Sequence, residues 1–233
     1  MIVVIGSPIA QSAGSAIVAG GLSAAIAGHC AAAGAAVQIV GRVGEDAAGD
    51  QVLLGLAAAG IGHVAVLREP GRPTPTAAAV TDGPVSPDGP ALGEALLDAA
   101  DLPDGESATA DDGAPAAQSA GLSVDAADLE LALRYVPDYR VLVVAADLDP
   151  SALDAVVTAA GWSGAHLVVL LTEGSAGTGI PDAATALLRP PTDPDGAFAA
   201  MVAGYAVALD RGDEPRSAFA AAQRAGGWAA VAG

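Results

Sequence analysis

A chain of 233 residues, 52% of them hydrophobic, is long enough to bury the core of one large α/β domain or two small ones. Its formal net charge is −18, and all nine basic residues are arginines, because the sequence contains no lysine and no asparagine. Such an acidic surface argues against binding to nucleic acid, and the missing residue types exclude any mechanism that needs a lysine base or an asparagine ligand.

The single cysteine, Cys30, excludes an intrachain disulfide and lies in an alanine-rich stretch, which is typical of a small core residue. The opening residues carry no basic charge and turn polar after six positions, so they indicate a first strand and no signal peptide. Apolar runs elsewhere are interrupted before they reach membrane-spanning length. The sequence therefore predicts a cytoplasmic protein without a membrane segment.

The first half of the chain alternates between strand and helix patterns. Residues 2–5 are a β-branched run ended by Gly6 and Ser7, as in a buried strand followed by a turn. The elements predicted next, in chain order, are a helix over 20–34, a strand over 37–40, a helix over 46–59, and strands over 63–67 and 77–80.

Between residues 82 and 119 the composition shifts to Asp, Pro, Gly, Ser and Ala. We interpret 84–119 as a mobile insertion in a single domain spanning 1–233, with helical character only over 91–100 and a mobile loop over 101–119. Ser123 is predicted to cap the helix that follows. The remaining predicted elements are a strand over 141–145, a helix over 151–160, a strand over 167–171, and helices over 196–209 and 215–230.

Strands that alternate with helices in this way predict an α/β fold with a mainly parallel sheet and helices on both faces. A nucleotide-binding domain of the Rossmann type would share that order. However, no intact G-x-G-x-x-G follows the first strand, so dinucleotide binding rests on element order alone.

Several stretches together resemble the ribokinase-like (PfkB) carbohydrate kinase family. They are I-V-V-I-G-S at 2–7, G-G-L-S-A-A-I-A with G-R-V-G-E-D-A-A-G within 20–49, A-A-A-G-I at 57–61, T-D-G at 81–83, A-G-L-S-V-D-A-A-D-L at 120–129 and T-D-P-D-G-A-F at 192–198. The resemblance spans most of the chain outside 84–119. It implies a ribokinase-like fold, ATP with Mg²⁺ as cosubstrate, and a sugar or nucleoside acceptor.

The departures from that pattern fall on the residues that bind the sugar. The family places an Asp after the Gly-Ser turn and an Asn after the Gly-Gly pair, whereas this chain has Gln11 and Ala25. Only about a dozen residues separate Gly6 from Gly20, so the family's lid strands are predicted to be absent.

The C-terminal signature of the family, D-T-x-G-A-G-D-A-F, supplies an anion hole and a catalytic Asp. Here three residues after Gly196 are missing, and Gly196 itself falls where the catalytic Asp should stand. Asp195 and Asp193 are candidates for a displaced catalytic base. Alternatively, both only cap the following helix, where acidic residues interact favourably with the helix dipole.

Other candidate ligand contacts are glycines and hydroxyls at predicted turns. Gly20 and Gly21 either receive a substrate against a helix N-terminus or only allow close packing. Thr172, Gly174, Gly177 and Gly196 are candidates for nucleotide binding, and a plain turn explains the first three equally well.

Two further groups of residues indicate no ligand-binding site. Arg42, Gly44, Asp46 and Gly49 are interpreted as shaping a turn, with Asp46 as a helix cap. The three histidines, His29, His63 and His166, are too far apart in sequence to indicate a metal site.

We therefore interpret the chain as a degenerate sugar kinase homologue with little or no kinase activity and a binding or regulatory role. The alternative is a minimal ATP-dependent carbohydrate or nucleoside kinase. The interpretation leaves open a sugar or nucleotide ligand, a protein partner and self-association.

Overall fold

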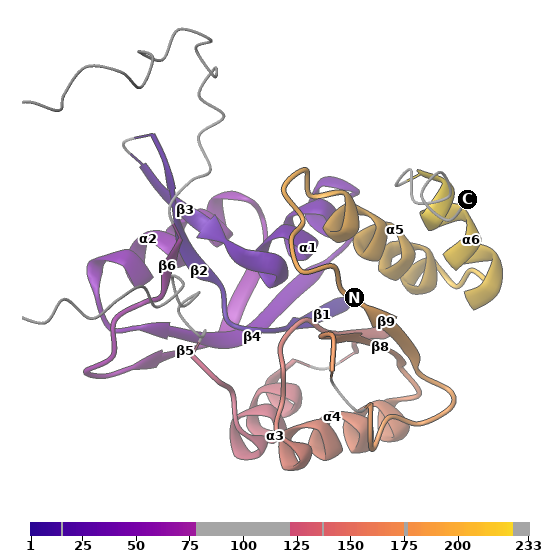
Figure 1. Cartoon of the computed structure of the whole chain (residues 1–233). Helices are drawn as coiled ribbons and strands as arrows, with labels where there is room; N and C mark the ends of the chain where they lie inside the picture. Colours follow the sequence, from indigo (N-terminus) through magenta and orange to yellow (C-terminus); the bar gives the residue numbers. More distant parts are fainter. Residues whose placement is uncertain (15, 78–121, 137, 175–176, 226–233) are drawn as a thin grey trace, which may run out of the picture. The chain divides into compact units, whose positions relative to one another are not determined.

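The central feature of the structure is a parallel sheet of six strands in the order β5-β4-β1-β7-β8-β9 (Figure 1). This computed structural model describes residues 1–14, 16–77, 122–136, 138–174 and 177–225. The strands are β1 Ile2–Ile5, β4 Val37–Gly44, β5 Gly62–Glu69, β7 Val141–Val144, β8 His166–Leu171 and β9 Thr185–Leu188. The predicted α/β fold with a mainly parallel sheet is confirmed.

The two middle strands, β1 and β7, are buried along their whole length. Their sequences, I-V-V-I and V-L-V-V, lack the polar alternation of a half-exposed strand because helices cover both faces. Ile2 pairs with Val37 of β4 on one side and with Val141 of β7 on the other. These runs are what made the strands recognisable in the sequence.

Six helices of the described residues cover the sheet. Ile2 and Val4 of β1 share a hydrophobic cluster with α1, α2, α5 and α6, whereas Val3 and Ile5 share another with α3 and α4. This alternation follows from the two-residue period of a strand. The helices are α1 Gly21–Ala32, α2 Ala47–Ala58, α3 Ala126–Tyr135, α4 Pro150–Ser163, α5 Ala197–Arg211 and α6 Pro215–Ala225.

The cluster around α1 and α5 is built largely from small side chains. Cys30 is fully buried there, and its Sγ lies 3.9 Å from the carbonyl oxygen of Ala203. Burial, reinforced by the negative charge of Asp210, raises the pKa of the Cys30 thiol to about 12. Cys30 is therefore a core residue, as predicted, and its thiol is not poised to act as a nucleophile.

Aspartates begin three of the helices. The carboxylate of Asp46 accepts a hydrogen bond from the Gly49 N–H at the start of α2, and Asp149 caps α4 in the same way. Helix α3 starts with a capping box made by Asp125 and Asp128. The predicted cap at Ser123 is therefore wrong by two residues, because a carboxylate at Asp125 satisfies the first-turn N–H groups instead.

A second, three-stranded sheet contradicts the prediction that no lid strands lie between Gly6 and Gly20. Its order is β3-β2-β6, from β2 Ile9–Ala13, β3 Ala16–Gly20 and β6 Thr76–Ala77. Strands β2 and β3 pair antiparallel from Ile9↔Gly20 to Ala13↔Ala16, so two five-residue strands fit into the short segment. The predicted absence of strands here is therefore wrong, because only two residues separate β2 from β3.

The described elements belong to one compact unit formed by Met1–Ala79 and Ser119–Gly233. Strand β9 was not predicted, because its four residues lie between proline-rich segments. The predicted strand over 77–80 overlaps β6 only at residue 77. The predictions for 84–119, for its parts 91–100 and 101–119, and for the helix beyond residue 225 lie outside the described residues.

Candidate functional site

The strand order creates a switch point between β1 and β7. From β1 the chain moves outward through β4 to β5, and from β7 it moves outward in the opposite direction through β8 to β9. Ligands of open α/β sheets bind outside the carboxyl ends of the strands at such a point. Gly6 follows β1 there, and Ala145, which follows β7, donates its N–H to the Ile5 carbonyl at 2.8 Å.

Gly6 packs directly on the first turn of α1. A Cβ added at Gly6 would lie 3.1 Å from the Cβ of Ser23 and 3.6 Å from that of Ala145. Ser23 is only 3% exposed, and its hydroxyl has no hydrogen-bond partner among the described residues. Helix α1 also lacks a side-chain cap, since its N-cap is Gly20. A buried, unpaired hydroxyl beside an uncapped helix start is unusual in a purely structural region.

The predicted substrate contacts meet at this same helix start. A Cβ on Gly20 would lie 2.5 Å from the Gln11 Oε1 atom and 2.7 Å from the Gln11 Cβ, so only glycine fits against Gln11. Gly21 follows with φ +84 and lies against Ile9. The structure therefore brings Gln11, Gly20 and Gly21 together, one turn from Ser23, while their role in binding stays a prediction.

The Arg42 guanidinium, on β4, contacts carboxylates at the end of β5 and at the start of α3. Its Nε donates to Asp128 at 2.9 Å and its Nη1 to Glu69 at 3.2 Å, while Nη2 contacts Asp128 and lies 3.5 Å from Asp125. The hydrogen bond that Arg42 donates to the Asp128 carboxylate is the main reason that the pKa of Arg42 is raised. Ser7 joins this frame by accepting the Arg42 N–H at 2.9 Å and donating to the Leu122 carbonyl. Arg42 thus has a structural role, as predicted.

Asp46 also has a structural role, since its carboxylate accepts hydrogen bonds from neighbouring residues. Its carboxylate accepts hydrogen bonds from the Thr74 hydroxyl at 2.6 Å, the Thr74 N–H at 2.9 Å and the Gly49 N–H at 2.8 Å. These bonds, with the Thr74 hydroxyl contributing most, lower the pKa of Asp46. The predicted helix cap at Asp46 is confirmed.

A pocket of about 310 Å³ opens beyond the carboxyl ends of β7 and β8. Its walls are mainly aliphatic, including Leu153, Leu170 and Ile180, and its rim includes Asp147 and Gly177. Of the four predicted nucleotide contacts, Gly177 alone lines this pocket.

Polar groups from three strand ends meet at the rim of that pocket. Asp147 accepts a hydrogen bond from the Thr172 hydroxyl at 3.0 Å and from the Arg189 guanidinium at 2.8 Å. Thr172 therefore stands beside the pocket, whereas Gly174 lies in a turn with φ +88 and open space around it. Because Asp147 neutralises Arg189, this rim offers little net positive charge to a phosphate.

The start of α5 is occupied by the protein itself. The Asp193 carboxylate accepts the Phe198 N–H at 3.0 Å and the Ala199 N–H at 2.9 Å, and these groups belong to the first turn of the helix. N–H groups in this position attract anions, so Asp193 already fills the place that a phosphate would take. The capping interpretation of Asp193 is confirmed by these contacts.

Asp195 and Gly196 behave differently from Asp193. Asp195 is exposed, and its side chain has no hydrogen-bond partner in the described part of the chain. Gly196 is the N-cap of α5, and a Cβ placed on it would lie 3.8 Å from the Nε2 atom of His29. His29 thus brings an imidazole to the position where the family resemblance places the catalytic Asp.

Within the described ranges, no group of three or more His, Cys, Asp or Glu residues could hold a metal ion. The same residues contain no helix that is long and apolar enough to cross a membrane.

Comparison with protein-family models gave no match, and the search of curated proteins found no relative. Solved structures gave clear similarities. Arabidopsis thaliana ribokinase, complexed with ribose and ATP, is 16% identical with a TM-score of 0.59, covering 97% of this chain and 90% of the ribokinase. Phosphofructokinase-2 from Escherichia coli, in complex with fructose-6-phosphate, is 12% identical with a TM-score of 0.58, covering 97% and 92%. The fold is ribokinase-like.

A carbohydrate kinase from Agrobacterium tumefaciens is also similar, at 18% identity and a TM-score of 0.54, covering 95% of this chain and 89% of the kinase. The ribokinase complex contains ribose and ATP. In this chain the N–H groups at the start of α5 are taken by Asp193, so these donors are not available to a phosphate.

Four residues of the site went unpredicted: Ser23, His29, Asp147 and Arg189. Ser23 lies within the recognised Gly-Gly segment, and its polar side chain in an otherwise apolar helix start was an available signal. The other three come from separate segments that only the folded sheet and helices bring into place.

Proposed function

We propose that this protein is a pseudokinase, which binds a small polar ligand on a ribokinase-like fold and does not transfer phosphate. The observation that carries the proposal is the Asp193 carboxylate on the Phe198 and Ala199 N–H groups. Phosphoryl transfer depends on positioning the phosphates, the metal and the acceptor by electrostatic contacts. A fixed carboxylate at the helix start repels the very group that these contacts would have to stabilise.

The chemistry of the switch point supports a role in binding. Ser23 has a buried hydroxyl without a partner among the described residues, and the Gln11 amide can both donate and accept hydrogen bonds. Neither group carries charge, so a neutral ligand rich in hydroxyls, such as a sugar or a nucleoside, suits the site better than a phosphate ester. A regulatory role would follow if binding changes how the protein contacts a partner or a second copy of itself.

Calorimetric titration tests the proposal directly. The protein is titrated with ATP·Mg²⁺ and, separately, with a panel of free sugars and nucleosides, and ADP release is then measured for every mixture. We expect heat with at least one sugar or nucleoside, weakened in Ser23→Ala and Gln11→Ala variants, and no ADP above the protein-free rate. Acceptor-dependent ADP release would contradict the proposal.

One observation favours a second function, a minimal kinase. Asp195 is exposed at the start of α5 and has no partner among the described residues, so it could act as a base that takes a proton from an acceptor hydroxyl. In that case ADP release would depend on both acceptor and ATP and would be lost in Asp195→Ala. Failure to bind ATP at millimolar concentration would exclude this alternative.

A further inference from the structure

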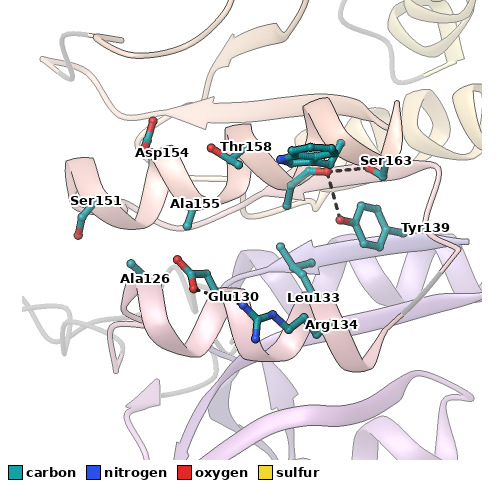
Figure 2. A pocket seen from close by; sticks show the side chains of 12 residues that line it. Ala126, Glu130, Leu133, Arg134, Tyr139, Ser151, Asp154, Ala155, Thr158 and Ser163 are labelled. Atoms are coloured by element: carbon teal, nitrogen blue, oxygen red, sulfur yellow. Dashed lines mark hydrogen bonds and ion pairs between the residues drawn. The ribbon is translucent and has the colours of Figure 1, made fainter.

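A groove between α3 and α4 has no assigned role. Its volume is about 860 Å³, and it lies between two helices that pack side by side (Figure 2). Small side chains line both walls: Ala126 on α3, and Ala155 and Ala159 on α4. Nothing in the candidate site at the carboxyl ends of the strands extends into this groove.

An exposed tryptophan lines this groove. Trp162, in the last turn of α4, is 88% exposed, although tryptophan is among the most buried residue types on average. The chain has only two tryptophans in 233 residues, so the exposure of one of them indicates a role on the surface. Tyr139 also lines the groove, and its hydroxyl hydrogen-bonds the Ala159 carbonyl at 3.4 Å, as Figure 2 shows.

The remaining walls carry charges of both signs. Glu130 and Arg134 of α3 are 4.0 Å apart, and their side chains are 60% and 77% exposed. An exposed pair of this kind contributes little stability, so both head groups are free to change partners at low cost. Asp154 and the Thr158 hydroxyl line the groove from α4.

This combination favours one chemical class of ligand. An anion would be repelled by Glu130 and Asp154, and a polycation would be opposed by Arg134. A neutral polyhydroxylated chain avoids both penalties, because its hydroxyls donate to carboxylates and accept from a guanidinium. The C–H face of a sugar ring also matches the negative face of an indole.

The dimensions agree with more than one sugar unit. Asp154 and Trp162 are eight residues apart on α4, which corresponds to about 12 Å along the helix. We infer that the α3/α4 groove is a second binding site, for a neutral oligosaccharide that stacks on Trp162 and hydrogen-bonds to Asp154, Glu130 and Arg134.

Saturation-transfer NMR and calorimetry with maltotriose, cellotriose and chitotriose test this site on the full chain. We expect at least one trisaccharide to bind, and Trp162→Ala to weaken that binding about tenfold or more, as loss of an aromatic stacking platform does elsewhere. Asp154→Asn should weaken it less. The matched controls Tyr135→Ala and Asp213→Asn, which alter exposed residues that do not line the groove, should leave it unchanged.

Three results would overturn the inference. They are no binding by any of the trisaccharides, binding that survives in both Trp162→Ala and Asp154→Asn, and a loss of binding in Tyr135→Ala that Trp162→Ala does not show. Spermidine is the charged probe: if it binds and the trisaccharides do not, the groove is a cation site. Because Trp162 is exposed, its variant should melt with the wild type, and any heat with free ATP·Mg²⁺ or monosaccharides should persist in it, which separates this site from the switch point.

Discussion

Removing the Asp193 carboxylate tests whether this side chain acts as the anion that binds the N–H groups at the start of α5. In Asp193→Ala, the Phe198 and Ala199 N–H groups, now bonded at 3.0 and 2.9 Å, lose their acceptor. Replacing a capping residue by alanine costs about 1 kcal/mol, with a range of about 0.5–2 kcal/mol. For a domain of this size that corresponds to a fall in melting temperature of about 2–4 °C per kcal/mol.

The assay is thermal unfolding followed by circular dichroism, repeated across a series of sulfate or phosphate concentrations with ionic strength held constant. The variant should melt below the wild type, and the added anion should restore part of the loss, because it can occupy the vacated N–H groups. Asp195→Ala is the matched control, since Asp195 is exposed and unpaired among the described residues. Equal melting of the two variants, or no anion effect specific to Asp193→Ala, would refute the reasoning.

Three other predictions concern the stability of the fold and are tested by thermal or urea unfolding. Gly20→Ala should destabilise the fold by about 1–3 kcal/mol, because its Cβ would overlap Gln11. Gly28→Ala is the control: Gly28 lies in α1 with open space around it, so its substitution should be neutral or stabilising by up to about 1 kcal/mol. Equal effects of the two substitutions would contradict the close approach of Gly20 to Gln11. Because the pKa of Asp46 is lowered from its ordinary value of 3.8, the ionised carboxylate stabilises the fold at pH values above 3.8. This stabilisation should be lost as the pH falls below about 3.8 towards the lowered pKa. Urea unfolding should show a smaller loss of stability over that range in Asp46→Asn than in the wild type. Raising NaCl from about 0.1 M to about 1 M should increase the melting temperature by screening repulsion within a chain of net charge −18, and a decrease would show that attractive pairs such as those around Arg42 dominate.

The sheet was predictable because its strands are continuous apolar runs. Residues 2–5 and 141–144 are buried on both faces, and such strands stand out against the polar turns that follow them. The helices were found from caps and stops, such as Asp46 at the start and Gly60 at the end of the second helix. Strands β2 and β3 were missed because I-A-Q-S-A and A-I-V-A-G are short, rich in small residues and joined by a very tight turn.

The candidate site was only partly predictable. Gln11, Gly20 and Gly21 are close in sequence, so their meeting at the start of α1 could be anticipated from a recognised motif. Asp147 and Arg189 are 42 residues apart in sequence and meet only because β7 and β9 end at the same edge of the sheet. The approach of His29 to Gly196 depends on how α1 and α5 cross, which sequence patterns do not specify.

The contact made by Asp193 supplies acceptors to the first turn of α5. A helix start leaves N–H groups that require acceptors, and a protein whose ligand supplies those acceptors is less stable when the ligand is absent. Here the acceptor is covalently part of the chain, so the start of α5 is satisfied at all times. This permanent cap makes the Phe198 and Ala199 N–H groups unavailable to a phosphate, which supports the proposed pseudokinase. The Ser23 hydroxyl, unpaired among the described residues, and the α3/α4 groove are the two places where a binding role can be sought first.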